Sequence, residues 1–273
     1  MLGVLNDETV CWLQSLWDEV AAFPVYQSTK AMRVLLQQIC LALEASDASW
    51  LVMRRMELNQ LNIPEEHFKI ISNEMKGWAP VTAMSLNPDS KLTRVLKQWS
   101  THVCENGIDP MTYEFVKGAG VLRAWTREDV VTDREWQDHW ISQKFLHYYG
   151  VGERMFVAIP VTLDCECVVM LDRPLRGNPF GQMDKRLLQI AVSGQMRLHR
   201  QLCLERGAID AAILLSRRER ETYCYLLTSM SEFEISEHMN LSAHTVHDYA
   251  RKLYRKFGVK GRIGLMARVL GSE

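Results

Sequence analysis

The sequence predicts an α+β protein with two domains: a mixed domain of helices and strands over residues 1–206 and an all-helical domain over residues 207–273. Three observations support this division. The chain has 273 residues, which is more than one small domain needs. Apolar segments with the pattern of β-strands occur between residues 48 and 171. From residue 214 onward, apolar positions recur at helical spacing, and serines stand where helices would begin.

Two amphipathic helices are predicted at the N-terminus. Their apolar positions recur at helical spacing from Val10 to Val20 and again from Met32 to Leu43. Such stripes pack either inside the protein or against a second copy, and the pattern leaves both alternatives open.

Four segments are predicted as strands, at residues 48–55, 77–85, 154–161 and 165–171. The last two are expected to pair in antiparallel fashion through a turn at residues 162–164. Pro80 places the second strand at an edge or a bend of the sheet. Residues 111–132 show no periodicity that predicts an element.

Three further helices are expected in this domain. One covers residues 89–104, one starts at Asp133 and ends at Gly150, and one runs over residues 182–206 before a hinge at 207–210. The last helix carries more apolar positions than one face needs, including Leu198 and Leu202. We therefore expect it to contribute to a homodimer interface.

The C-terminal domain is organised around a helix predicted over residues 243–257. Ser242 is a strong N-cap residue, and Gly258 suits a left-handed C-cap. The apolar residues recur at helical spacing and form one stripe, which consists of Val246, Ala250, Leu253 and Phe257.

Two shorter helices precede this one and a fourth follows it. Ser216 and Glu219 have the spacing of a capping box, and Ser231 caps the next helix. Residues 240–241 leave room only for a tight turn, so the two helices flanking them are predicted to form a helix-turn-helix. A closing helix is expected over residues 262–270.

The charge of the chain is unevenly distributed. The formal net charge is −1, so the whole protein is not a polycation. Between residues 242 and 262, however, the only anion is Asp248, and the cations are Arg251, Lys252, Arg255, Lys256, Lys260 and Arg262. A local basic patch of this kind is typical of surfaces that bind phosphate backbones, and it predicts double-stranded DNA as a partner.

Several motifs in this region resemble, in order, the LuxR/GerE-type helix-turn-helix of bacterial transcription regulators. They are Ser216-Arg-Arg-Glu-Arg-Glu, Glu234-Ile-Ser, Leu241-Ser-x-x-Thr245-Val246 and Tyr254-Arg-Lys-Phe-Gly-Val-Lys-Gly-Arg262. The Lys that commonly follows Thr-Val in this family is His247 here, and the His two positions further on is Tyr249. These departures concern the DNA sequence that is recognised rather than the fold.

The resemblance implies roles for residues on the recognition helix. Bases would be read from the positions of His247, Asp248 and Arg251, with Arg251 suited to a guanine edge and Asp248 able to accept from cytosine. Phosphate contacts are expected from Ser242, His244, Thr245, Lys252, Arg255 and Lys256. One such domain covers few base pairs, so a homodimer on a palindromic operator is expected. The alternative is an interaction or dimerisation module whose helix-turn-helix no longer binds DNA.

The N-terminal domain resembles GAF- or PAS-like sensory domains, with outer helices, a middle antiparallel sheet and a long final helix. This resemblance implies a regulatory and dimerisation domain that controls the helix-turn-helix. Its tryptophans either line an apolar cavity for a small molecule of unknown identity or form an ordinary core. The candidate cavity residues are Trp78, Trp99, Trp125, Trp136 and Trp140. Autoinducer-binding relatives use a Trp/Tyr pair followed by an Asp, and that spacing is absent here, so an acyl-homoserine lactone is not expected.

Enzymatic chemistry is not predicted. No paired catalytic residues and no phosphate-binding loop occur, and Cys165 and Cys167 on one strand face are two ligands at most, so neither a metal site nor a cofactor is expected. The pattern of a phosphorylated receiver domain is also missing. The odd count of 7 cysteines predicts reduced thiols, and no apolar run is long enough to span a membrane, so we expect a cytoplasmic protein without a membrane partner.

Overall fold

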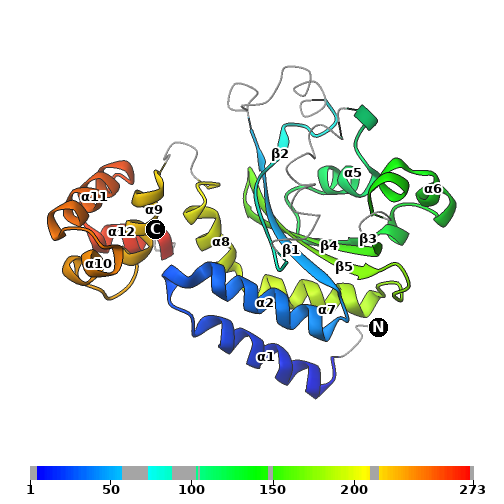
Figure 1. Ribbon diagram of the computed structural model, residues 1–273, viewed down its shortest axis with the longest axis horizontal. Coiled ribbons are helices and arrows are strands. Elements are labelled where there is room, and N and C mark those ends of the chain that lie inside the picture. Colours follow the sequence, from blue (N-terminus) through cyan, green and yellow to red (C-terminus); the bar gives the residue numbers. More distant parts are fainter. Residues whose placement is uncertain are drawn as a thin grey trace. The chain divides into compact units, whose positions relative to one another are not determined.

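The computed structural model describes residues 5–56, 73–87, 103, 105–146, 150–209 and 215–270 (Figure 1). The chain forms two compact units, one made of residues 1–20 and 32–199 and the other of residues 21–31 and 200–273. Each unit contains a hydrophobic cluster of its own. The predicted fold class is confirmed: a mixed sheet-and-helix unit comes first, and the C-terminal unit is helical.

A five-stranded antiparallel sheet forms the centre of the first unit, in the order β2-β1-β5-β4-β3. All four predicted strands are present. A fifth strand, β3, falls in the stretch that showed no periodicity, because four residues are too few to display an alternation. The strands are β1 (Asp47–Arg55), β2 (Trp78–Ser85), β3 (Arg123–Thr126), β4 (Val151–Thr162) and β5 (Cys165–Pro174).

The predicted β4–β5 hairpin is confirmed. Its strands pair in antiparallel fashion from Val151↔Pro174 to Thr162↔Cys165, and Leu163 at the turn is 88% exposed. Every residue of β5 before Pro174 is buried. A strand with both faces buried needs a layer on each side, and the helices supply these layers.

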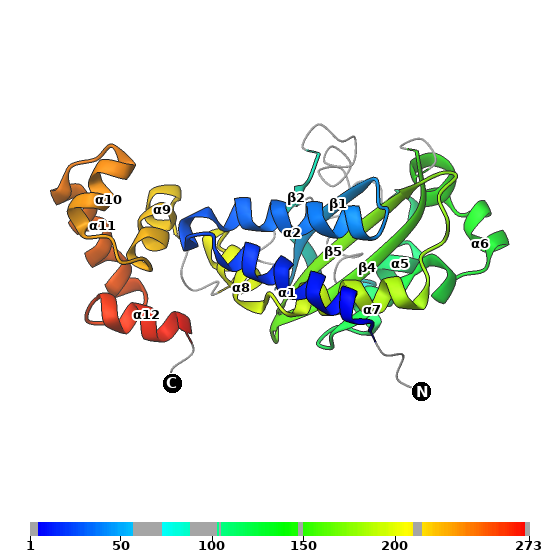
Figure 2. The ribbon, with the colours of Figure 1, turned by 90° about the horizontal axis from the view of Figure 1, so that it is seen from below.

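Helices α1 (Asp7–Ala21), α2 (Ser28–Ala42) and α7 (Gln182–Ser193) cover one face of the sheet (Figures 1 and 2). Helices α5 (Pro110–Lys117) and α6 (Asp133–Asp138) lie on the other face. The two N-terminal helices bury their apolar stripes inside the protein, which answers the choice that the sequence left open. The buried residues include Leu13, Leu16 and Val20 of α1 and Leu35, Leu36 and Ile39 of α2.

The prediction of a single long helix over residues 182–206 is wrong. The chain forms α7 up to Ser193 and a separate helix, α8 (Met196–Glu205), with the break at Gly194. A Cβ built on Gly194 would lie 2.5 Å from ring carbons of Trp17, so the close approach of α1 requires a glycine here. The proposed role of this helix in a dimer also fails for the two residues named, because Leu198 and Leu202 are buried within the protein.

The helix predicted from Asp133 to Gly150 is shorter than expected. Thr132 caps its start, as its hydroxyl accepts from the backbone N–H of Glu135, but α6 ends when His139 adopts an extended conformation with φ −76° and ψ 139°. A short π-helical segment, η4 (Ser142–Leu146), follows. The helix expected over residues 89–104, with Trp99 in it, lies outside the described residues except for position 103.

Four helices of the C-terminal unit match the sequence prediction. They are α9 (Arg217–Leu226), α10 (Glu232–Met239), α11 (Ala243–Lys256) and α12 (Arg262–Leu270). The three predicted N-caps are confirmed, because the hydroxyls of Ser216, Ser231 and Ser242 each accept from a backbone N–H three residues further on. Each cap satisfies a donor that the first helical turn would otherwise leave unpaired.

The same unit includes residues from the N-terminal part of the chain, which the sequence did not predict. The short 3-10 helix η1 (Val25–Gln27) contributes Tyr26, whose ring centroid lies 5.0 Å from that of Tyr225 in α9. Ser28 donates a hydrogen bond to Glu205 at the end of α8. Among the residues that the structure describes, none of the helices combines the length and the apolar composition that spanning a lipid bilayer requires.

Candidate nucleic-acid interface

Helix α11 has one buried and one exposed face. The predicted apolar stripe is confirmed, since Val246, Ala250 and Leu253 are fully buried and Phe257 nearly so. These residues pack with α9, α10 and α12 in a single cluster. The side chains left on the outside are His244, His247, Asp248, Arg251, Lys252, Arg255 and Lys256. The apolar stripe in the sequence therefore predicted correctly which face of α11 is exposed.

The turn before α11 is tight and well defined. Asn240 ends α10 in the left-handed conformation, with φ 51° and ψ 49°, which asparagine tolerates better than most residues. Ser242 then begins α11, and its hydroxyl lies 2.7 Å from the hydroxyl of Thr245 as well as capping the Thr245 N–H. His244 is exposed beside them. The three residues at this helix start that were predicted to contact phosphate therefore lie close together.

Both histidines of α11 are paired with carboxylates. The Nδ1 atom of His247 lies 2.9 Å from a carboxylate oxygen of Glu232, which is in the first turn of α10. The Nε2 atom of His244 lies 3.7 Å from a carboxylate oxygen of Asp248, one turn further along α11. The sequence did not identify Glu232, because no spacing rule shows which residue of a neighbouring helix faces a given side chain.

The cations of the predicted basic patch fall into two groups. Arg251, Lys252 and Arg255 are exposed on α11, and the ammonium of Lys252 also lies 5.6 Å from the centroid of the Tyr249 ring. The ammonium of Lys256 instead lies 2.8 Å from a carboxylate oxygen of Glu219 in α9. Lys256 was predicted to contact phosphate, and this ion pair competes with that role.

Arg262 does not belong to the exposed patch. Its guanidinium donates to the backbone carbonyls of Leu226 at 2.7 Å and Met230 at 2.5 Å, and also to that of Thr228. These carbonyls belong to the end of α9 and the loop after it, where the helix leaves acceptors unpaired. The inclusion of Arg262 among the DNA-facing cations is therefore corrected: its charge fixes the loop between α9 and α10.

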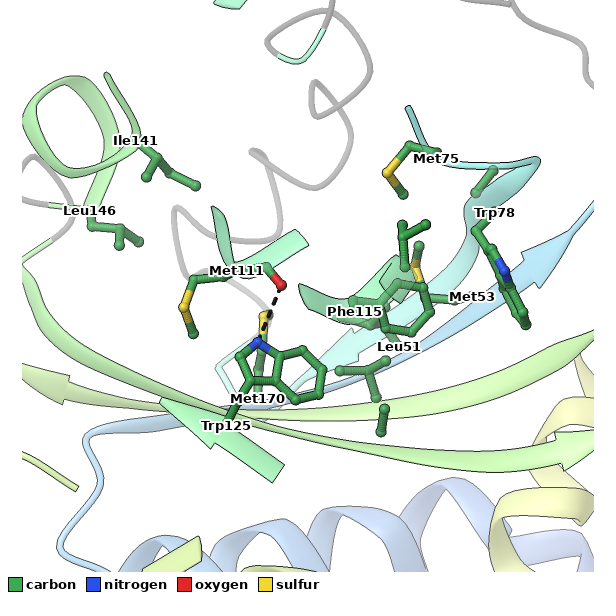
Figure 3. Close-up of a cluster of buried hydrophobic side chains, with 14 of the residues drawn as sticks. Leu51, Met53, Met75, Trp78, Met111, Phe115, Trp125, Ile141, Leu146 and Met170 are labelled. Atoms are coloured by element: carbon green, nitrogen blue, oxygen red, sulfur yellow. Dashed lines mark hydrogen bonds between the residues drawn. The ribbon is translucent and has the colours of Figure 1, made fainter. Parts of the chain in front are cut away.

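Two of the tryptophans named from the sequence, Trp78 and Trp125, belong to one hydrophobic cluster in the first unit (Figure 3). Trp78, Trp125 and Trp136 are buried in the same hydrophobic cluster, and Trp140 packs against it. Trp99 lies outside the described residues. The rings have specific partners: Trp78 meets Phe115 edge to face at 5.6 Å between centroids, and Trp125 stacks on Phe156 at 5.2 Å.

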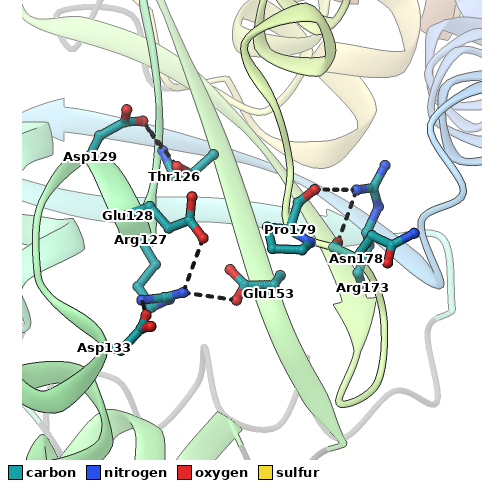
Figure 4. A network of polar contacts seen from close by, with 9 residues as sticks. All are labelled: Thr126, Arg127, Glu128, Asp129, Asp133, Glu153, Arg173, Asn178 and Pro179. Atoms are coloured by element: carbon teal, nitrogen blue, oxygen red, sulfur yellow. Dashed lines mark hydrogen bonds and ion pairs between the residues drawn. The ribbon is translucent and has the colours of Figure 1, made fainter.

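Several ion pairs occur in the first unit, and one of them contacts this cluster. Arg123 pairs with the buried Glu166 at 2.9 Å, and its guanidinium lies over the rings of Phe115 and Trp125. Arg154 and Asp172 form a bidentate pair at 2.6 and 2.8 Å. Figure 4 shows a third group, in which Arg127 contacts carboxylates that include Glu153 and Asp133.

A metal site is not formed by these groups. Among the described residues, no three histidines, cysteines or carboxylates are grouped so that they could hold a metal ion. Cys165 and Cys167 are buried in β5 with the side chains of the sheet core.

Comparisons with known proteins bear on the two units differently. Residues 214–269 match the family model described as "Bacterial regulatory proteins, luxR family". No curated protein matches the chain significantly.

Among solved structures, the chain is similar to SdiA in complex with octanoyl-rac-glycerol, with 11% identity, a TM-score of 0.47 and 97% of each chain covered. It is also similar to Escherichia coli SdiA, with 12% identity, a TM-score of 0.42, and 96% of this chain and 98% of that chain covered. The VqsR LBD domain from Pseudomonas aeruginosa matches with 13% identity, a TM-score of 0.41, and 71% and 93% coverage.

These structural similarities have TM-scores below 0.5, and they carry no conclusion about function. The sequence match is specific to the C-terminal helices, and it coincides with the capped helices and the buried stripe of α11 described above. Residues 214–269 are therefore a helix-turn-helix domain of the luxR family of bacterial regulatory proteins.

Proposed function

We propose that the protein is a transcription regulator that binds a palindromic operator through α11 as a homodimer and acts in the cytoplasm. The observation that carries the proposal is the exposed face of α11. Three cations, Arg251, Lys252 and Arg255, stand on it outside a fully packed helical core. A helix with one face held rigidly and the other polar and basic suits the major groove.

Roles on this face follow from side-chain chemistry. Arg251 has a planar fork of donors that matches the acceptors of a guanine edge, while Lys252 and Arg255 supply charge to phosphates. Ser242, His244 and Thr245 at the start of α11 place hydroxyl, imidazole and backbone N–H groups where a phosphate would approach. His247 and Asp248 are exposed between these two groups, and their proposed role is to read base edges.

Dimerisation is proposed because of the geometry of DNA recognition. A single recognition helix covers few base pairs, so high affinity needs two half-sites and a protein with two-fold symmetry. Leu198 and Leu202 are not proposed as part of the dimer interface, because they are already buried within one chain.

The first unit is proposed to regulate this binding by taking up a small molecule near the aromatic cluster. The cluster is built of large apolar side chains from both the sheet and α5, and its described residues include no metal-binding group. A signal received there can act only through a difference in its affinity for two states of the protein.

The test is binding of the full-length protein to a random-sequence duplex at several salt concentrations. Binding that weakens linearly on a log–log plot as salt rises is expected, because phosphate contacts release counterions. Arg255→Ala should lower the slope of this plot by about one. The matched control is Arg176→Ala, which removes an exposed arginine from the loop before α7 and should leave the slope unchanged. No salt-dependent binding would leave the alternative, an interaction module that no longer binds DNA.

A further inference from the structure

The contact between His247 and Glu232 joins the recognition helix to the helix before it. Nδ1 of His247 lies 2.9 Å from Oε2 of Glu232, and the two side chains are 53% and 35% exposed. Glu232 belongs to the first turn of α10, which Ser231 and Glu234 cap reciprocally. The backbone carrying the carboxylate is therefore fixed, and the helix dipole favours a negative charge at this position.

The chemistry of the pair determines the proton on the imidazole. An ionised carboxylate can only accept hydrogen bonds, so at 2.9 Å the Nδ1 atom must carry the hydrogen. The bond also fixes the rotation of the ring, and it leaves Nε2, on the other side of the ring, for another partner. A ring without this partner would present either nitrogen in several orientations.

The position of the ring matters because of its neighbours on α11. His247 lies one turn before Arg251 on the same side of the helix, and both are exposed. Asp248, between them in sequence, is directed to His244 instead. Of the three residues expected to read bases, His247 is thus the one held by another helix.

We propose that Glu232 is a specificity-determining positioning residue, which holds His247 so that Nε2 contacts one base edge in the operator. The proposal rests on the proposed DNA-binding function. Glu232 itself does not touch the base. The pair has a second effect on DNA binding. Without a partner, the Glu232 carboxylate would repel the DNA phosphates, and the hydrogen bond to the His247 imidazole reduces this repulsion.

Glu232 thus has two proposed effects, on base preference and on binding to any duplex. Its variants should change these two quantities in a combination that a merely structural residue would not produce. Glu232→Ala should relax the base preference at one position of the half-site, by roughly fivefold or more, while binding to random duplex stays equal or improves. Glu232→Gln, whose amide oxygen can still accept from Nδ1, should keep the preference. His247→Ala should lose the same preference and also weaken binding to random duplex, because the carboxylate is left without a partner.

The double variant completes the test. Glu232→Ala combined with His247→Ala should bind random duplex more tightly than His247→Ala alone, and its base preference should be no lower than in either single variant. The exposed pair contributes little to folding, so thermal unfolding of all variants should match that of the parent closely.

The experiment selects full-length parent and variant proteins against a pool of duplexes with randomised half-sites, and it then measures binding to single-base changes of the selected site. A parent that selects no sequence overturns the proposed function and this inference with it. A parent that selects a site, together with Glu232→Ala that selects the same site with undiminished preference, overturns the inference alone. Loss of preference in Glu232→Ala that Glu232→Gln retains supports it.

Discussion

The ammonium of Lys256, in the last turn of α11, lies 2.8 Å from the carboxylate of Glu219, in the first turn of α9. The carboxylate is nearly buried, with 9% of its side chain exposed, and it also accepts from the backbone N–H of Ser216. Burial alone would raise the pKa of Glu219, but the hydrogen bonds from Lys256 and Ser216 lower the pKa below its ordinary value. The Lys256–Glu219 ion pair therefore connects α11 to α9.

Replacing Lys256 by Ala should destabilise the C-terminal helices by about 1 kcal/mol, because the carboxylate keeps its desolvation but loses its cation. Hydrogen exchange of peptides covering residues 215–270 would measure this. Lys252→Ala, on the exposed side of α11, is the control and should change exchange by less than about 0.5 kcal/mol.

The same pair has a defined pH dependence. Since the folded pKa of Glu219 is depressed, its contribution is present above the unfolded pKa, about 4.3, and is lost as the pH falls through the folded value. The difference between parent and Lys256→Ala should therefore disappear in acid. An undiminished difference below the folded pKa would assign the effect to packing of the lysine stem.

His199 is expected to make the first unit sensitive to mild acid. Burial lowers the pKa of His199 to about 4, and the neutral ring accepts from Nε1 of Trp50 and donates to the carbonyl of Val192. The unfolded state, with a pKa of about 6.5, binds a proton that the folded state excludes, so stability is full above pH 6.5 and is lost as the pH falls towards 4. The loss between pH 7 and pH 5 should be about 2 kcal/mol.

Urea unfolding followed by tryptophan fluorescence measures this selectively, because all eight tryptophans precede residue 141. The control is His199→Gln, whose amide can both accept from Trp50 and donate to Val192 without titrating. Its stability should fall less between pH 7 and pH 5. Equal falls in the two proteins would place the acid sensitivity elsewhere.

Gly194→Ala should destabilise the first unit by about 1–3 kcal/mol, because the added methyl group would overlap the ring of Trp17. The backbone itself is not the obstacle, since Gly194 has φ −63° and ψ −13°. In a Trp17→Leu background the same change should therefore be neutral or slightly stabilising. Urea unfolding of the four proteins gives the coupling energy, and a coupling near zero would contradict the steric explanation.

Arg251 and Arg255 are expected to differ in their effects on DNA binding. Arg251→Ala should reduce the binding free energy for the selected site by about 1–3 kcal/mol and relax the base preference at one base pair. Arg255→Ala should weaken binding to all DNA sequences alike. Titration of the selected site and of a random duplex with each variant separates the two effects. If both variants weaken every duplex equally, Arg251 contacts a phosphate rather than a base.

The sequence by itself determined the elements whose signals are local. Caps at Ser216, Ser231 and Ser242, and the stripe from Val246 to Phe257, depend on residues three or four positions apart, and all were confirmed. Strands with several alternating or apolar positions were found for the same reason. The luxR-type domain was identifiable because its motifs are contiguous segments of such signals.

Tertiary structure decided which of the charged residues remain available. Lys256 and Arg262 looked like Arg251 and Arg255 in the sequence, but one pairs with Glu219 and the other binds carbonyls at the end of α9. The need for a glycine at position 194 depends likewise on Trp17, which is far away in the chain. Such partners are set by how helices pack, and periodicity along one helix carries no information about the residues that face it from another.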